Sequence, residues 1–344
     1  MEPIGLALVG AGAFGEFCLR AFASLSQVRI QAVCDIDVAR AETMAFQYQA
    51  QAYDNLADLL RDPAIQVVAL NTPPYLHAEQ GLAVLQSGRH LFCEKPLALT
   101  RTDAQALIDA ATQNHVLLTV DYVMRYNPFW QAAAHLARSE ALGHLRHMGL
   151  SNHAAGLSLP AHHWFWDKTQ SGGIWIEHGV HFFDAFAWVA GGTGKILAST
   201  AYNRADGATD RVEALARFGN TAAHFYHAFD QSGQNEQTAV GLTFEQGYVP
   251  LREWAPTSIE IVTPLAPKAL IPHLPGEIET RPTSNNRSLI RAYAPEGKAA
   301  MVAFVNSIRT GHPLPVSGQH GLASLQLALA AENFTQQADL VAIT

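Results

Sequence analysis

Cysteine is scarce in this sequence, and the few cysteines form no metal-binding or redox pattern. Of the 344 residues, three are cysteines (Cys18, Cys34 and Cys93), and no two of them form a Cys-x-x-Cys pair. Disulfide frameworks and cysteine metal sites both need several cysteines at short, regular spacings. The sequence therefore indicates neither, and we expect a protein of the reducing cytoplasm.

Positive charge and long apolar runs are also lacking. Lysine and arginine number 22 against 30 acidic residues, which gives a net charge of -8 at pH 7. Nucleic acids and anionic membranes bind basic surfaces, so we expect neither as a partner. No apolar run is long enough to cross a membrane, and Ile4–Val9 is not preceded by the basic residues of a secretory leader, so we expect none.

What the first third of the sequence does contain is an alternation of short β-branched runs with helical patterns. This alternation is typical of βαβ units and predicts an α/β fold with a parallel sheet. The expected strands are Ile4–Val9, Val28–Cys34, Ile65–Leu70, His90–Cys93 and Val116–Val120. One expected helix is capped by Asp54 and runs through Leu60, and another starts near His77 and is closed by Gly88. Thr100 with Asp103 resembles a capping box at the start of a third.

The pattern changes after Tyr126, where Asn127-Pro128 interrupts the chain and longer alternating runs follow a helical segment, 129–141. Alternation of this kind predicts a second, α+β domain with a large, mostly antiparallel sheet. Its expected strands are Leu145–Ala154, Ile196–Tyr202, Arg211–Phe218, Thr221–Ala228 and Gln237–Phe244. Pro250–Pro282 is predicted to be a surface loop, and helices are predicted over Lys298–Arg309 and Leu322–Gln336.

A glycine fingerprint, Gly10-Ala11-Gly12-Ala13-Phe14-Gly15, follows the first expected strand and opens a helical pattern. In that context Gly10 permits the tight turn, Gly12 lets the backbone approach a pyrophosphate, and Gly15 lets helix and strand pack closely. The helix N-terminus then faces the phosphates. We therefore predict a dinucleotide site that includes Ala13 and Phe14.

Asp35 stands at the end of the second expected strand, where a carboxylate can accept hydrogen bonds from the adenosine ribose. The same carboxylate repels a 2′-phosphate, so we expect NAD, with NADP less favoured. Arg40 is close enough in sequence to soften this preference, but we expect it on a solvated helix face.

Glu94-Lys95-Pro96 follows a short apolar strand in the same part of the chain. Ligands of parallel sheets bind at the carboxyl ends of the strands, so Lys95 is predicted to lie at the ligand-binding edge and to handle protons at a nicotinamide site. Pro96 restricts the backbone of Lys95 and allows a cis bond between them.

A glycine-led segment from Ser171 to Asp184 reads as a helix that ends at Gly191-Gly192. Glu177, His181 and Asp184 follow one another at i, i+4 and i+7, which predicts one face with two acids and an imidazole. That combination favours acid–base chemistry. The same face could bind a metal together with His162-His163, but no His-Glu-x-x-His spacing is present and we expect no metal.

Aromatic residues are concentrated in His163-Trp164-Phe165-Trp166. Trp164 and Trp166 are candidates for a wall against a sugar ring. Clusters of this kind equally form cores or subunit interfaces, so the sequence does not decide between a sugar-binding wall and a packing role.

Taken together, these residues resemble the Gfo/Idh/MocA family of oxidoreductases, named for glucose-fructose oxidoreductase and inositol dehydrogenase. The resemblance covers most of the chain. It rests on Gly10 to Gly15, Cys34 to Asp37, Thr72-Pro73 with His77, Gly88-Arg89-His90 leading into Glu94-Lys95-Pro96, Arg125 before Asn127-Pro128, and Gly172 to Asp184.

The resemblance implies an NAD-binding Rossmann domain over residues 1–125 and a substrate-binding and oligomerisation domain over residues 126–344. The second domain would form homo-oligomers, dimers or tetramers, through its open sheet. Cofactor contacts are implied for Thr72, Pro73, His77, Glu94 and Lys95.

Catalytic roles are implied as well. Lys95 would touch the reacting hydroxyl, His181 would accept its proton, and Glu177 would occupy the position of the usual aspartate. Pro74 stands where the family often has Asn, and the extra imidazole of His178 leaves open which histidine is the base. Further substrate contacts are expected from Arg125, Trp164, Trp166, His178 and Asp184.

We therefore expect an NAD-dependent dehydrogenase that acts on a secondary hydroxyl of a sugar, polyol or glycoside. Two alternatives remain at this stage. One is a glycoside-cleaving enzyme that oxidises its substrate transiently, and the other is a non-catalytic NAD-responsive regulator, against which intact Lys95 and His181 argue.

Overall fold

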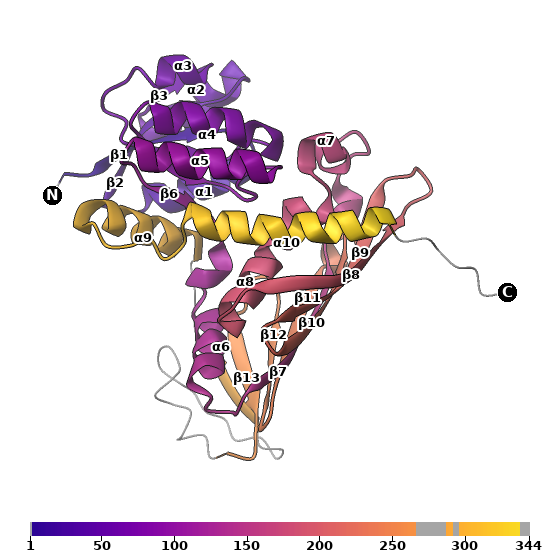
Figure 1. The fold of residues 1–344 in the computed structure, drawn as a ribbon. Coiled ribbons are helices and arrows are strands. Elements are labelled where there is room, and N and C mark those ends of the chain that lie inside the picture. The colour runs from indigo at the N-terminus through magenta and orange to yellow at the C-terminus, as the bar shows by residue number, and fades with distance from the viewer. Residues whose placement is uncertain (1, 266–286, 292–295, 338–344) are drawn as a thin grey trace. The chain divides into compact units, whose positions relative to one another are not determined.

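The structure is a computed structural model that describes residues 2–265, 287–291 and 296–337. The chain divides into two compact units (Figure 1). The first contains Met1–Val123 and Pro295–Leu325, and the second contains Met124–Ala294 and Gln326–Thr344. By this division Pro295–Leu325 belongs to the first unit. The domains expected from the sequence, 1–125 and 126–344, place the same segment in the second.

The first unit is built on a six-stranded sheet with the order β3-β2-β1-β4-β5-β6. Every pair of neighbouring strands in it is parallel. This order is that of the doubly wound dinucleotide-binding fold, so the predicted fold class is confirmed. The strands are β1 (Ile4–Val9), β2 (Val28–Cys34), β3 (Gln51–Tyr53), β4 (Val67–Leu70), β5 (His90–Cys93) and β6 (Leu118–Val120).

The helices of the first unit cover a sheet whose central strand is buried along its whole length. A parallel sheet buried on both faces explains why its strands read as continuous apolar runs. Helices α1 and α9 pack together, as do α4 and α5, which lie side by side in Figure 1. The helices are α1 (Ala13–Ala23), α2 (Val38–Tyr48), α3 (Leu56–Leu59), the 3-10 turn η1 (Pro74–Leu76), α4 (His77–Gln86), α5 (Arg101–Gln113), α9 (Glu296–Thr310) and the start of α10 (Gly318–Gln337).

The second unit is built on an eight-stranded sheet with the order β14-β13-β12-β11-β7-β10-β9-β8. Its pairings are antiparallel except for the parallel pair β10 and β7, as the predicted mostly antiparallel sheet requires. The strands are β7 (Leu145–His153), β8 (Gly194–Asn203), β9 (Thr209–Phe218), β10 (Thr221–Ala228), β11 (Gln237–Phe244), β12 (Tyr248–Arg252), β13 (Ser258–Val262) and β14 (Arg287–Arg291).

One face of this sheet is covered by α8 (Val180–Ala190), which also packs against α6 (Pro128–Ser139). The rings of Phe183 and Phe186 on α8 lie 4.9 and 4.7 Å from that of Phe225 on β10. Aromatic contacts at these distances anchor the helix to the sheet. The shorter elements are η2 (Val123–Tyr126), η3 (Gly156–Ser158), η4 (Trp164–Trp166), α7 (Lys168–Ser171), the π-helical turn η5 (Trp175–Gly179) and η6 (Gly233–Asn235).

The prediction of a surface loop over Pro250–Pro282 is wrong for its first part. Strand β12 begins before Pro250, and β13 lies inside the predicted loop. Both strands alternate buried with less buried positions, with Leu251, Ile259 and Ile261 in the core. The prolines obscured this alternation in the sequence. The remainder of the predicted loop, from residue 266, lies outside the described residues.

The helix caps predicted from the sequence for α5 and α3 can be compared with the structure, and one of them is wrong. Thr100 caps α5 by accepting the Asp103 N–H, as predicted. The cap of α3 is Asn55 and not Asp54, since the Asn55 Oδ1 accepts the Asp58 N–H at 2.8 Å. Asn is as good a cap as Asp, so the two adjacent candidates could not be separated by residue type.

This correction gives a paired test. Asn55→Ala should lower the free energy of unfolding by about 1 kcal/mol, because the first turn of α3 loses its acceptor. Asp54→Ala should change it by less than about 0.5 kcal/mol. Urea denaturation of the full chain measures both, and a larger loss for Asp54→Ala would return the capping role to Asp54.

Candidate active site

The glycine loop between β1 and α1 has the shape that a dinucleotide pyrophosphate requires. Gly10 has φ +94°, and a Cβ there would lie 2.6 Å from the Asn71 carbonyl oxygen. A Cβ on Gly15 would lie 2.0 Å from the Gly10 carbonyl oxygen. A Cβ on Gly12 would meet nothing within 4 Å. The loop is therefore closed on its inner side and open at Gly12, where a phosphate can approach the start of α1.

Asp35 fixes this loop to the end of β2. One carboxylate oxygen accepts the Ala11 N–H at 2.7 Å, and the other accepts the Asp37 N–H at 2.9 Å. Arg40 lies on the exposed face of α2, as expected, but it also forms ion pairs. Its guanidinium forms ion pairs with Asp35 at 3.4 Å and Asp37 at 3.1 Å, although its side chain remains 48% exposed.

His77 links the segments that follow β4 and β5. Its ring is fully buried, with Nδ1 2.7 Å from the Pro96 carbonyl oxygen and Nε2 2.7 Å from that of Thr72. The Lys95-Pro96 peptide bond is cis. The imidazole thus holds together two of the segments on which the predicted cofactor contacts lie.

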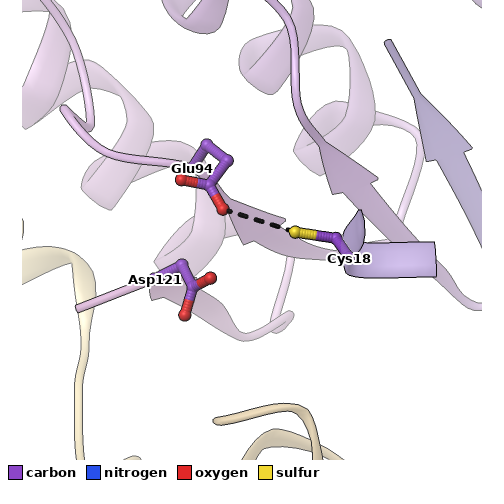
Figure 2. A group of neighbouring side chains, drawn as sticks. All are labelled: Cys18, Glu94 and Asp121. Carbon is purple, nitrogen blue, oxygen red and sulfur yellow. Dashed lines mark hydrogen bonds between the residues drawn. The ribbon is translucent and has the colours of Figure 1, made fainter. Parts of the chain in front are cut away.

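Two acids and a thiol meet at Glu94, the residue before Lys95; Figure 2 shows Cys18, Glu94 and Asp121. The side-chain ligand atoms of Cys18, Glu94 and Asp121 all lie within 4.8 Å of one another. Burial, and then the charge of Asp121, raises the pKa of Glu94 well above its ordinary value. Burial raises the pKa of Asp121 to about 6. The sequence reasoning missed Asp121 and Cys18, although Asp121 directly follows the last parallel strand.

In the second unit the predicted acid–base helix is interrupted by a π-helical turn. Glu177 and His178 lie in η5, whereas His181 and Asp184 lie in α8. The uniform α-helical spacing assumed from the sequence therefore does not hold. The glycine at the helix end is as predicted, since Gly191 caps α8 in the left-handed conformation.

Asp184 and Arg125, both predicted substrate contacts, bind each other. Two guanidinium nitrogens of Arg125 donate to the two oxygens of Asp184, each at 2.7 Å. Burial raises the pKa of Asp184, and Arg125 opposes that effect. A bidentate pair of this kind joins the segment before α6 to α8, which is a positioning role.

Aromatic rings surround the two histidines. The Trp254 ring centroid lies 4.8 Å from that of His178 and 4.9 Å from that of His181. His227 stacks on His178 at 4.8 Å with an interplanar angle of 17°. Trp254 was missed because it lies within the stretch predicted to be a loop.

The predicted aromatic wall is partly occupied by protein groups. The Arg204 guanidinium lies 4.2 Å from the centroid of the Trp166 ring, and the Phe165 ring packs 4.5 Å from Phe229. One face of Trp166 is therefore covered by a cation. Trp164 packs beside His163, whose ring nitrogen accepts the Phe165 N–H.

A parallel sheet of dinucleotide-binding order, with an open glycine loop and an acid after β2, defines the first unit as a nucleotide-binding domain. Two models of one family match the chain. The model described as "Oxidoreductase family, NAD-binding Rossmann fold" matches residues 4–122, and the "GFO/IDH/MocA C-terminal domain" matches residues 130–249. Together they span more than half of the chain, which therefore belongs to the Gfo/Idh/MocA family.

The chain is similar to inositol 2-dehydrogenase of Salmonella typhimurium, at 32% identity over 42% of this chain and 46% of that protein. It spans about half the length of the first curated relatives it matches.

Two solved structures share its fold. One is a putative myo-inositol dehydrogenase from Sinorhizobium meliloti, with a TM-score of 0.78 and 22% identity over 97% of this chain and 98% of that one. The other is levoglucosan dehydrogenase in complex with NADH and levoglucosan, with a TM-score of 0.83 and 17% identity over the same shares. Among the described residues, no helix combines the length and apolarity needed to span a membrane.

The second and third glycines of the loop, Gly12 and Gly15, give matched variants. Gly15→Ala should lower stability by about 1–3 kcal/mol, because its Cβ overlaps main chain that cannot move freely. Gly12→Ala should keep the thermal stability but weaken NAD binding by roughly tenfold or more, because the methyl occupies the open space. Thermal unfolding and calorimetric NAD titration measure the two effects. Unchanged NAD affinity in Gly12→Ala would show that the open space is not the pyrophosphate site.

Proposed function

We propose that this protein is an NAD-dependent oxidoreductase that transfers a hydride between a secondary hydroxyl of a sugar, polyol or glycoside and nicotinamide. The observation that carries the proposal is the position of Lys95. It follows β5 at the edge of the sheet where the glycine loop and Asp35 also lie. A cation at that edge can act on a substrate bound beside a dinucleotide.

The first unit supplies the groups that would hold NAD. The Gly12 opening and the start of α1 suit the pyrophosphate, and Asp35 suits the adenosine ribose. Thr72, Pro73 and Glu94 are assigned to the nicotinamide half, which the family membership supports. When bound, NAD supplies the hydride acceptor.

NAD is proposed over NADP because Asp35 is 8% exposed and carries two carboxylate oxygens at the end of β2. A 2′-phosphate placed there would meet that charge. Arg40 offsets part of this repulsion, since it pairs with both Asp35 and Asp37. The preference for NAD should therefore be clear without being absolute.

Lys95 and His181 are proposed to act on the substrate oxygen. The Lys95 ammonium stabilises the negative charge that develops there, and His181 accepts the hydroxyl proton. Glu177 orients the imidazole or a substrate hydroxyl. His181 is preferred over His178 because the His178 ring is stacked on His227 and also contacts the Phe229 ring.

The proposed substrate class follows from the chemistry of the side chains that are assigned to the substrate. Lys95, Glu177 and His181 are hydrogen-bonding side chains, and adjacent hydroxyls on one ring can satisfy several of them. Trp254 adds an aromatic face beside both histidines, which suits the C–H face of a sugar ring. The names inositol 2-dehydrogenase and levoglucosan dehydrogenase among similar proteins support a cyclic, polyhydroxylated substrate.

A substrate screen tests this function. Cyclic polyols, sugars and aryl glycosides should reduce NAD at least about tenfold more efficiently than propan-2-ol or lactate, because a simple alcohol can form fewer hydrogen bonds with Lys95, Glu177 and His181. NADH absorbance and aglycone release are followed in parallel, with NADP as the comparison cofactor.

The outcomes separate the alternatives. Aglycone release without net NADH would indicate glycoside cleavage through transient oxidation. NAD binding without turnover of any compound would indicate a regulator. Equal efficiency with NAD and NADP would contradict the role given to Asp35.

Lys95→Ala should retain NAD binding but lose turnover by on the order of 100-fold or more, because one electrostatic contact to the reacting oxygen is removed. The matched control is Lys168→Ala, which removes a half-exposed lysine that pairs with Glu332 in the second unit. Steady-state kinetics and NAD titration are measured for both. Normal turnover in Lys95→Ala would make Lys95 a structural residue.

A further inference from the structure

Glu94 and Asp121 are brought together by the pairing of β5 with β6. Cys93 and Val120 are partners in that parallel register, so the residue after each strand emerges at the same edge. The Asp121 N–H donates to the Cys93 carbonyl oxygen at 2.9 Å, which fixes the two backbones at this point. The two carboxyl groups therefore lie close together because of the sheet, and side-chain flexibility cannot separate them far.

Both carboxyl groups are removed from water. Glu94 is 6% exposed and Asp121 is 2% exposed, and their nearest side-chain oxygens lie within 4.8 Å. The buried Oδ1 of Asp121 has no hydrogen-bond partner. Two ionised carboxylates at this separation in a dry site repel strongly, so one of them retains a proton.

In the part of the chain that the structure describes, the other titratable groups that face Glu94 and Asp121 are two thiols and one ammonium, and they determine how many of the two carboxyl groups can ionise. Burial raises the pKa of the Cys18 and Cys93 thiols, with Glu94 adding to the effect on both, so both remain neutral. The charge of Lys95 acts on both carboxyl groups and lowers the pKa of each. One ammonium balances one carboxylate, which leaves the second carboxyl protonated.

We propose that Glu94 and Asp121 share a single proton, so that the pair presents one negative charge beside Lys95. Asp121 is then a positioning residue that acts through Glu94, the residue before Lys95. The shared proton follows from the first unit alone. The catalytic consequence rests on the proposed function.

If the two acids share one proton, removing either acid leaves the total charge of the pair unchanged. In Glu94→Gln, Asp121 ionises, and in Asp121→Asn, Glu94 ionises, so each single variant loses the proton but keeps the negative charge. Only the double variant removes the charge.

The proton itself is tested by infrared spectroscopy of the full chain. The wild type should show a carbonyl-stretch band of a buried carboxylic acid at neutral pH, and the band should disappear as pH rises. Both single variants should lack it. Glu94→Asp should retain it, and so should the control Asp109→Asn, which removes an exposed carboxylate on α5. Absence of the band in the wild type, or its persistence in both Glu94→Gln and Asp121→Asn, would overturn the shared proton.

The catalytic consequence is tested by the pH profile of kcat. Loss of the shared proton adds a second negative charge beside Lys95, so the wild-type profile should contain an ionisation that both single variants lack. A wild-type profile that both single variants reproduce would make Asp121 a merely structural residue. If no substrate were turned over, the proposed function would fail, while the infrared result would still decide the shared proton.

Discussion

Parallel strand pairing is the constraint on which the chemistry of the first unit depends. Because its strands run in one direction, their carboxyl ends meet at one edge of the sheet. Gly10, Asp35, Lys95 and Asp121 each follow the end of a different strand by one or two residues. Residues far apart in the sequence thereby become neighbours, and the fold determines which side chains share charge.

Buried carboxyl groups are neutralised in different ways in the two units. In the second unit, the bidentate contact with Arg125 neutralises Asp184, and loss of either partner would leave an unpaired charge at a cost of about 3–5 kcal/mol. In the first unit, Glu94 and Asp121 have like charge, so a proton must take the place of the second cation. A fixed ion pair joins secondary-structure elements rigidly. A proton can move between Glu94 and Asp121, which suits a position next to Lys95.

The sequence predicted most of the fold because each regular element carries its own signal. Buried parallel strands appear as apolar runs, and Thr100 with Asp103 marks a helix start that the structure confirms. Short or atypical elements lacked such a signal. Strand β3 has three partly exposed residues, and β12 contains Pro250, which argues against a strand when the sequence is read alone.

The site was predicted less completely, because it depends on contacts that the sequence does not encode locally. The spacing of Glu177 and His181 was visible, but the π-helical turn between them was not. Trp254 reaches both histidines from a segment without periodicity, so no spacing rule could place it there. Asp121 is different, since it directly follows the strand that pairs with β5. An acid immediately after a buried parallel strand lies at the ligand-binding edge, and the strand order alone would have placed it beside Glu94.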